Sequence, residues 1–308
     1  MRFAVIGAGN VGATIAHLLI MKGFGNVYLL DIMADMAKGK AVDLNQSKFL
    51  FKSGCSVKGG DDYSEIIDSD FIIITAGLAR KPGMSRDDLL MKNLEIIKGI
   101  SLKIKESKKS PFVIVVSNPL DIMTYAVYRL TGFPANKVMG MAGVLDTYRF
   151  MHYIQDKLGT KTPEIEALTL GSHGDTMVPV SSLTKVEGKS IGSLMNEQEL
   201  AETEEKTKQG GAEIVGLLKT GSAYYAPAAS AVRMVESIVS DEGAVLPCSV
   251  LARGEYGIKD IFIGLPAKLD KSGFSGIVKM GLNEKERAEL AKSAEAIKEQ
   301  VDKIIKHL

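Results

Sequence analysis

Short apolar runs alternate with helical patterns through the first half of this chain, and this alternation limits the possible folds more than any other feature. Four runs are continuous and apolar, at residues 3–6, 27–30, 71–74 and 112–116. Strands that are buried on both faces of a parallel sheet have this pattern. Helical patterns lie between the runs, near residues 10–22, 35–48 and 87–108. We therefore expect repeated βαβ units, and with them an α/β fold built on a doubly wound parallel sheet.

The pattern changes near residue 143. A helical segment near 144–158 leads to strand-like runs near 164–170 and 177–187. Longer helices follow, with two further strand-like runs near 244–251 and 259–265. We predict an N-terminal nucleotide-binding type of domain over residues 1–142 and a C-terminal mixed α+β domain over residues 143–308.

The C-terminal segment has the spacing of an amphipathic helix. Apolar residues recur at intervals of four and three, at Leu290, Ala294, Ile297, Val301, Ile304 and Leu308. Asn283 and Glu286 fit an N-cap and its partner at the third helical position. We predict a helix packed on the core, and a free helix that binds a partner is the alternative.

Composition excludes several classes of function. The chain has 308 residues, is 45% hydrophobic, and so can bury a sizeable core. Its 38 basic and 37 acidic side chains give a net charge of +1, and it has no Trp, which argues against a nucleic-acid partner. The segment Met1–Gly7 is too short for a signal peptide or membrane span, so we expect a cytoplasmic protein without membrane association. Cys55 and Cys248 form no metal or redox motif, and no metal is expected.

A glycine-rich turn follows the first apolar run directly. Gly7, Gly9 and Gly12 form the G-x-G-x-x-G pattern, which supplies a tight turn, a close approach to a pyrophosphate and close helix packing. Asp31 ends the next run, 19 residues after Gly12, where an acidic side chain accepts hydrogen bonds from a ribose. The first basic residue after it is Lys38, so the pattern favours NAD over NADP in a Rossmann domain. A tight turn with an unrelated Asp that caps the next helix is the alternative.

Further residues are assigned to the cofactor site. Thr75, Ala76 and Gly77 form a turn of small residues after the run at 71–74, where cofactors lie in such sheets. We also assign cofactor contacts to Asn10, Val11, Asn93, Val116 and Asn118.

His173 is the candidate acid or base. It lies between glycines in Gly171-Ser172-His173-Gly174-Asp175, which leaves room for a substrate to approach, and only three other histidines exist. An imidazole titrates near neutrality, as proton transfer requires. Alone, a histidine is a weak signal.

Asp146 and Arg149 strengthen this hypothesis. They are three residues apart and share one face of a helix, where a surface ion pair is the alternative. Oxidation of a 2-hydroxy acid by hydride transfer needs a base, a carboxylate to orient that base, and a guanidinium for the substrate carboxylate. His173, Asp146 and Arg149 supply one of each, because a buried Asp fixes a tautomer and Arg binds a carboxylate with two parallel bonds.

At these residues, and over nearly its whole length, the chain resembles the lactate and malate dehydrogenase family, in particular its lactate-dehydrogenase-like members that act on malate. The likeness is carried by the glycine-rich turn and by four further motifs, at 76–86 (AGLARKPGMSR), 117–121 (SNPLD), 145–150 (LDTYRF) and 171–175 (GSHGD). The resemblance implies that His173 accepts the substrate proton and pairs with Asp146, and that Arg149 binds the C1 carboxylate. It implies that Asn118 binds substrate near the nicotinamide, with a cis Asn118–Pro119 bond.

Residues 78–86 carry the choice of substrate. The resemblance implies a lid in which Arg86 polarises the substrate carbonyl and Arg80 binds the second carboxylate of oxaloacetate, where lactate dehydrogenases usually have glutamine. Ala223 stands where those enzymes typically have threonine. A desolvated Arg without its partner is penalised by on the order of 3–5 kcal/mol, so pyruvate should be a poor substrate. Two solvated loop charges are the alternative.

The predicted function is NAD-dependent interconversion of malate and oxaloacetate, by a homodimer or homotetramer as the resemblance implies. Two alternatives stay open. One is a dehydrogenase of lactate or another 2-hydroxy acid, which differs chiefly at Arg80. The other is a dinucleotide-binding regulator without catalytic activity.

Overall fold

A sheet of nine strands forms the centre of the molecule. The computed structural model describes residues 1–78 and 85–308. Strand order is β14-β13-β12-β6-β5-β4-β1-β2-β3. The N-terminal strands are β1 (Arg2–Ile6), β2 (Asn26–Leu30), β3 (Val57–Gly60), β4 (Phe71–Ile74), β5 (Phe112–Val115) and β6 (Val138–Gly140). Every pairing among these six is parallel, as the doubly wound prediction requires.

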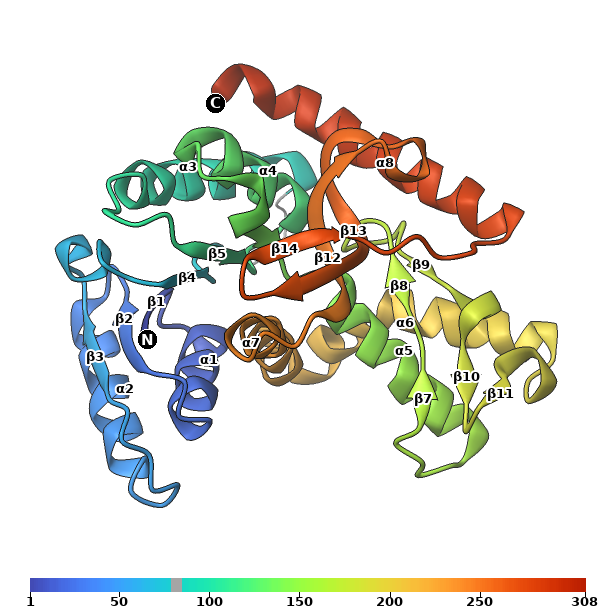
Figure 1. The fold of residues 1–308 in the computed structure, drawn as a ribbon, viewed down its shortest axis with the longest axis horizontal. Coiled ribbons are helices and arrows are strands. Elements are labelled where there is room, and N and C mark those ends of the chain that lie inside the picture. Colours follow the sequence, from blue (N-terminus) through green and yellow to red (C-terminus); the bar gives the residue numbers. More distant parts are fainter. Residues whose placement is uncertain (79–84) are drawn as a thin grey trace.

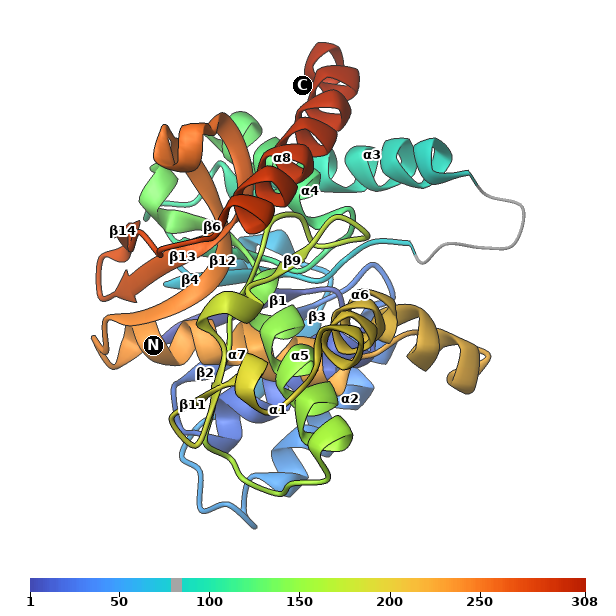
Figure 2. The ribbon, with the colours of Figure 1, turned by 90° about the vertical axis from the view of Figure 1, so that its right-hand side faces the viewer.

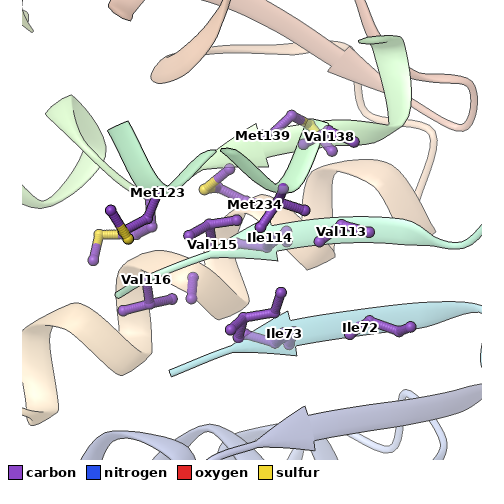
Figure 3. Packing of buried hydrophobic residues seen from close by; sticks show 14 of the residues in the cluster. Ile72, Ile73, Val113, Ile114, Val115, Val116, Met123, Val138, Met139 and Met234 are labelled. Carbon is purple, nitrogen blue, oxygen red and sulfur yellow. The ribbon is translucent and has the colours of Figure 1, made fainter. Parts of the chain in front are cut away.

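Aliphatic side chains hold this sheet between its helices. Strand β4 is Phe-Ile-Ile-Ile and all four residues are buried. Figure 3 shows side chains of β4 and β5 packed together with Met123 and Met234. Burial of such side chains stabilises the fold by roughly 1.5–3 kcal/mol for each one fully buried. The continuous apolar runs therefore reflect strands covered on both faces.

Helices cover the two faces of the parallel strands. They are α1 (Asn10–Met21), α2 (Ala34–Ser47), α3 (Arg86–Ile104) and α4 (Leu120–Thr131). Figure 1 shows α3 and α4 on one face, and α1 with α7 (Tyr225–Val239) on the other. The first two helices begin and end within one residue of the predicted bounds. The third begins and ends earlier than predicted, because Ile104 is its last buried apolar residue before a polar turn.

The second half extends the same sheet with antiparallel strands. These are β12 (Ala244–Arg253), β13 (Lys259–Asp270) and β14 (Gly273–Ile277). Ser249 of β12 pairs with Gly140 of β6, so the sheet runs across the expected domain boundary. The remaining helices of this half are α5 (Gly143–Leu158) and α6 (Glu197–Leu218), which pack together, and α8 (Glu284–Ile304).

The two long strand-like runs predicted after α5 are wrong in extent. The structure has short pairs instead, namely β7 (Ile165–Glu166), β8 (Thr169–Leu170), β9 (Val178–Pro179), β10 (Lys185–Val186) and β11 (Lys189–Ser190). A 3₁₀ turn at 181–183 interrupts the second run. A separate cluster of buried apolar residues joins Phe150 and Ile154 of α5 to Ile165 of β7 and Val186 of β10.

The C-terminal helix α8 is packed on the body of the protein (Figures 1 and 2). Asn283 accepts a hydrogen bond from the Glu286 amide at 2.8 Å, and the Glu286 carboxylate accepts one from the Asn283 amide at 2.9 Å. The predicted capping box is therefore present. Leu290, Ile297 and Val301 are buried against β13 and α4, so the alternative of a free helix is wrong. Among the described residues, no helix combines the length and apolar character needed to cross a membrane.

Candidate active site

The turn between β1 and α1 needs glycine at two positions for reasons internal to the protein. Gly7 has a φ of +107°, and a Cβ there would lie 2.6 Å from Thr75 Oγ1. A Cβ on Gly12 would overlap the carbonyl oxygen of Gly7. Gly9 differs, because a Cβ there would meet no atom within 4 Å. The space in front of Gly9 is open to a ligand, which fits the close approach of a pyrophosphate.

The N-terminus of α1 begins at this open position. Gly9 is the N-cap residue, no side chain caps the helix, and its first turn has no acidic residue. The first amide groups of the helix, at Asn10 and Val11, have no partner within the helix. Such amides, together with the helix dipole, favour a bound anion. The residues present therefore fit the pyrophosphate of NAD.

Asp31 lies beside the glycine-rich turn, as its spacing predicted. Its Oδ2 accepts a hydrogen bond from the Ala8 amide at 2.6 Å, and its Oδ1 accepts one from the Met33 amide at 2.9 Å. An ionised carboxylate has about four acceptor sites, so capacity for ribose hydroxyls remains. Lys40 of α2 donates to the Ala8 carbonyl at 2.7 Å. Sequence reasoning missed this lysine, because only the fold brings α2 back to the turn.

The other assigned cofactor residues gather at the carboxyl ends of β4 and β5. Thr75 Oγ1 donates to the Gly7 carbonyl at 3.0 Å. Asn93 of α3 is buried, and its amide group accepts from Leu78 N at 2.7 Å and donates to the Asn118 carbonyl at 2.8 Å. Asn93 thus ties together the segments that follow two neighbouring strands.

Ser117 adds a second tie between these segments. Its hydroxyl donates to the Ala76 carbonyl at 2.6 Å, and the Val116 amide donates to the Ile74 carbonyl at 2.8 Å. A Cβ on Gly77 would lie 3.4 Å from the Asn93 side chain. The Asn118–Pro119 peptide bond is cis, as the resemblance implied.

His173, Asp146 and Arg149 form one connected cluster. His173 Nδ1 lies 2.8 Å from Asp146 Oδ2, and Asp146 Oδ1 accepts a bond from Arg149 Nη1 at 3.3 Å. The Asp146 side chain is 1% exposed, and the side chains of the other two are 14% exposed. Asp146 and Arg149 are therefore not a surface ion pair. One buried carboxylate serves both the imidazole and the guanidinium.

The charge of this cluster alters the titration of the imidazole. Burial disfavours the imidazolium, but the Asp146 charge and hydrogen bond outweigh burial, so the pKa of His173 is raised above its ordinary value. His173 therefore keeps a proton to higher pH than a free imidazole.

Asp121, at the start of α4, is a further buried carboxylate in this region, and sequence reasoning gave it no role. Its Oδ2 accepts from the His173 amide at 2.9 Å and its Oδ1 from Ser249 Oγ at 2.6 Å. Burial raises the pKa of Asp121 to about 6, although both hydrogen bonds oppose the shift. Its position in the 117–121 motif, directly after a buried strand, is the signal that could have found it.

His173 lines a cavity of about 480 Å³. Arg86, the first residue of α3, lines the same cavity and pairs with Asp175 at 2.6 Å, and both side chains are mostly exposed. Arg80, the residue predicted to choose the substrate, lies outside the described residues. In residues 1–78 and 85–308, no group of three or more His, Cys, Asp or Glu side chains could hold a metal ion.

Comparison with known proteins decides the family. Residues 1–140 match the NAD binding domain of lactate/malate dehydrogenases, and residues 143–308 match the alpha/beta C-terminal domain of the same enzymes. The chain belongs to the lactate/malate dehydrogenase family. Its cofactor is therefore NAD, and it is an oxidoreductase of this family, which excludes the alternative of a regulator that merely resembles one.

Individual relatives are similar over nearly their full length. Malate dehydrogenase 1 of Anaeromyxobacter dehalogenans is 47% identical over 302 residues, which cover 97% of each chain. The crystal structure of Cryptosporidium parvum malate dehydrogenase has a TM-score of 0.96 and 40% identity, with 100% of this chain and 99% of that chain covered. A lactate dehydrogenase from the same organism was solved with lactic acid and nicotinamide adenine dinucleotide. It has a TM-score of 0.94 and 36% identity, with 98% of this chain and 96% of that chain covered. The fold alone therefore does not choose between the two substrates.

Proposed function

We propose that this protein catalyses the reversible, NAD-dependent oxidation of malate to oxaloacetate. Family membership and the malate dehydrogenases among its relatives support the reaction class. The observation that carries the proposal is the single Asp146 carboxylate, which contacts both the imidazole of His173 and the guanidinium of Arg149. The arrangement joins a proton acceptor and a carboxylate-binding group in one buried unit.

His173 accepts the proton of the substrate hydroxyl during oxidation and returns it during reduction. Because Asp146 occupies Nδ1, the other ring nitrogen is left for the substrate. Asp146 fixes the tautomer and stabilises the imidazolium, in keeping with the raised pKa of His173. NAD, when bound, supplies the hydride acceptor. The glycine-rich turn, the N-terminus of α1 and Asp31 would hold it, and the segments that follow β4 and β5 would add further contacts.

Two described arginines bind the substrate. Arg149 takes the C1 carboxylate, because its guanidinium shares Asp146 with His173 and can donate two parallel bonds. Arg86 polarises the carbonyl that is reduced. Its ion pair with Asp175 is solvent-exposed, so its net contribution is about 0–1 kcal/mol, and a substrate oxygen can replace it. Asn118 completes the contacts near the nicotinamide.

Arg80 selects malate over lactate by pairing with the second carboxylate. The small side chain of Ala223 leaves room that threonine would fill. Residues 1–142 hold the cofactor and residues 143–308 supply His173, Asp146 and Arg149, so the substrate is bound where the two meet.

The active form is a homodimer or homotetramer. Large apolar side chains are exposed on and around α2 and at the start of α7, with Ile32 93%, Leu50 83% and Tyr225 70% exposed. A hollow of about 390 Å³ between α1, α5 and α7 is lined mostly by apolar atoms and by small side chains of α7. Surfaces of this kind on a monomer mark contacts with another chain. Sedimentation velocity at micromolar concentration tests this, and a monomer at all concentrations contradicts it.

Initial rates with four substrate pairs test the function. Oxaloacetate and pyruvate are each assayed with NADH and NADPH, and NADH with oxaloacetate should give the highest kcat/KM. Arg80→Gln should shift preference toward pyruvate by about 10- to 100-fold, because it removes a charged hydrogen bond to the second carboxylate. Equal kcat/KM for pyruvate and oxaloacetate in the unmodified protein would contradict malate as the substrate.

A further inference from the structure

Two adjacent glycines lie in the interior of α6. Gly210 and Gly211 are well inside a helix that continues from Glu197 to Leu218. Each glycine in a helix interior costs about 1 kcal/mol relative to alanine. The helix forms despite this cost.

A side chain at these positions would meet α5, and the two positions face different atoms. A Cβ on Gly210 would lie 3.0 Å from Tyr153 Oη, 3.2 Å from its ring and 3.5 Å from Cδ of Arg149, in the aliphatic part of that side chain. A Cβ on Gly211 would have three nearest neighbours, all in the guanidinium of Arg149: Nη2 at 3.6 Å, Nη1 at 3.7 Å and Cζ at 3.9 Å. Tyr153 Oη donates to Glu213 of α6 at 2.6 Å, which holds the two helices together here.

The guanidinium of Arg149 is thus bounded on two sides. Asp146 accepts a hydrogen bond from Nη1 at 3.3 Å. On the other side, a Cβ added at Gly211 of α6 would be in van der Waals contact with the guanidinium. A planar guanidinium binds a carboxylate with two parallel bonds only if its plane can align with the carboxylate. The space left by the missing side chain is therefore next to the atoms that must align.

We infer that Gly211 is a positioning residue for Arg149, and that the absence of its side chain lets the guanidinium align with the substrate carboxylate. Gly210 has a different role, which is to let α6 approach Tyr153. This inference rests on the proposed role of Arg149. It adds a residue on α6 that sets substrate affinity without touching substrate.

A set of three Gly→Ala variants on the same helix tests the inference. Gly216→Ala is the matched control, because this residue is exposed and a Cβ there would meet nothing within 4 Å. Both Gly216→Ala and Gly211→Ala should keep or raise Tm, since alanine favours the helix. Gly210→Ala should lower Tm, because a Cβ at 3.0 Å from Tyr153 Oη shifts the tyrosine away from its hydrogen bond to Glu213.

Kinetics separate positioning from stability. Gly211→Ala should raise KM for oxaloacetate roughly 10-fold, the effect of weakening one charged hydrogen bond. KM for NADH should stay within about twofold, and kcat should change less than KM. Gly216→Ala should leave both KM values unchanged. If Gly211→Ala keeps the KM of the control, or raises KM for NADH as much as KM for oxaloacetate, the inference is wrong.

The pKa of His173 gives a readout that does not depend on turnover. A methyl group at 211 would be in ordinary van der Waals contact with the guanidinium and would limit how it turns between Asp146 and the substrate carboxylate. Because the Asp146 charge raises the pKa of His173 and the Arg149 charge lowers it, a change in how the guanidinium lies changes that pKa. NMR titration of the imidazole, assigned with His173→Asn, should give a different pKa in Gly211→Ala from that in Gly216→Ala. If the unmodified protein does not reduce oxaloacetate, the proposed function fails, and this comparison still decides the role of Gly211. Equal pKa values in the two variants would then overturn it.

Discussion

The cofactor region and the acid–base cluster of this protein are built in opposite ways. The cofactor region is mostly one continuous stretch, from Gly7 to Asp31, in which glycines and backbone amides make the contacts. The acid–base cluster consists of His173, Asp146, Arg149 and the adjoining Asp121, and most of these side chains are far apart in the sequence. His173 is bonded to Asp146 across 27 positions and to Asp121 across 52, and Asp121 is bonded to Ser249 across 128.

The difference lies in what each region loses when one residue changes. In the cofactor region the carboxylate of Asp31 is partly exposed, so water can replace a lost partner. In the acid–base cluster the carboxylates of Asp146 and Asp121 are buried, and removal of a hydrogen-bond partner there leaves a buried group that water cannot satisfy. Substitutions should therefore have larger and more coupled effects in the acid–base cluster.

The largest effect is expected for His173→Asn. Loss of the proton acceptor should lower kcat roughly 10⁴-fold. NADH binding should stay unchanged, because the cofactor region contains no contact to His173. Stopped-flow assays give kcat, and titration of NADH fluorescence gives Kd. A large loss of NADH affinity would show that the two regions are not separate.

Asp146→Asn should lower kcat roughly 10²- to 10³-fold and also move the pH profile. Reduction of oxaloacetate requires protonated His173, and Asp146 raises the pKa of that imidazole. Without the carboxylate, burial and the Arg149 charge both lower the pKa of His173, and only the smaller effect of the Asp121 charge opposes them. The fall in kcat/KM for oxaloacetate with rising pH should therefore begin at lower pH than in the unmodified enzyme. An unchanged profile would contradict the assignment of this ionisation to His173.

Asp121 should make the protein more stable as the pH falls toward 4. Its folded pKa of about 6 exceeds the ordinary 3.8, so its contribution is full below about pH 4 and is lost as pH rises through 6. A shift of about two units corresponds to about 3 kcal/mol. Denaturant unfolding of Asp121→Asn should show a smaller gain in stability between pH 7 and pH 5 than the unmodified protein. An equal gain in both proteins would show that the pKa of Asp121 in the folded protein is not raised.

The smallest effect is expected for Asp31→Ser. This variant should raise KM for NADH about 10-fold, because a charged acceptor of ribose hydroxyls becomes neutral. Its KM for oxaloacetate should stay the same. Preference for NADH over NADPH should also fall, since a negative charge no longer opposes the 2′-phosphate. Steady-state kinetics with both cofactors measure this preference. A drop in kcat as large as that of His173→Asn would show that the cofactor region and the acid–base cluster do not act separately.

The same contrast explains how much of this protein could be predicted from its sequence. The parallel strands and the helices between them follow from local apolar periodicity, and the glycine-rich turn with Asp31 follows from spacing. His173, Asp146 and Arg149 could be found because the chemistry requires one residue of each type. Their assignment to catalysis and binding stays a prediction, which the variants at His173, Asp146 and Gly211 test.

What could not be predicted depends on long-range contacts. Asp121 is a charged residue in a helical first turn, and nothing local indicates that Ser249 and the His173 amide surround it. Lys40 reaches Ala8 only because β2 and α2 fold back beside β1. Gly211 was missed for the same reason, since its neighbour Arg149 is on another helix. The strands after α5 were predicted to be too long, because the residues of a 3₁₀ turn alternate in polarity much as those of a strand do.

The pairing of β6 with β12 has a consequence for how the molecule comes apart. Ser249 joins the sheet next to Gly140 and also binds Asp121, so one strand supports both the sheet and the acid–base cluster. A fragment that ended near residue 142 would leave β6 as an open edge with unpaired amides and carbonyls, the kind of edge on which chains aggregate. Heat or proteolysis should therefore not release a free nucleotide-binding fragment. We expect the two halves to unfold together in a single transition when the protein is heated.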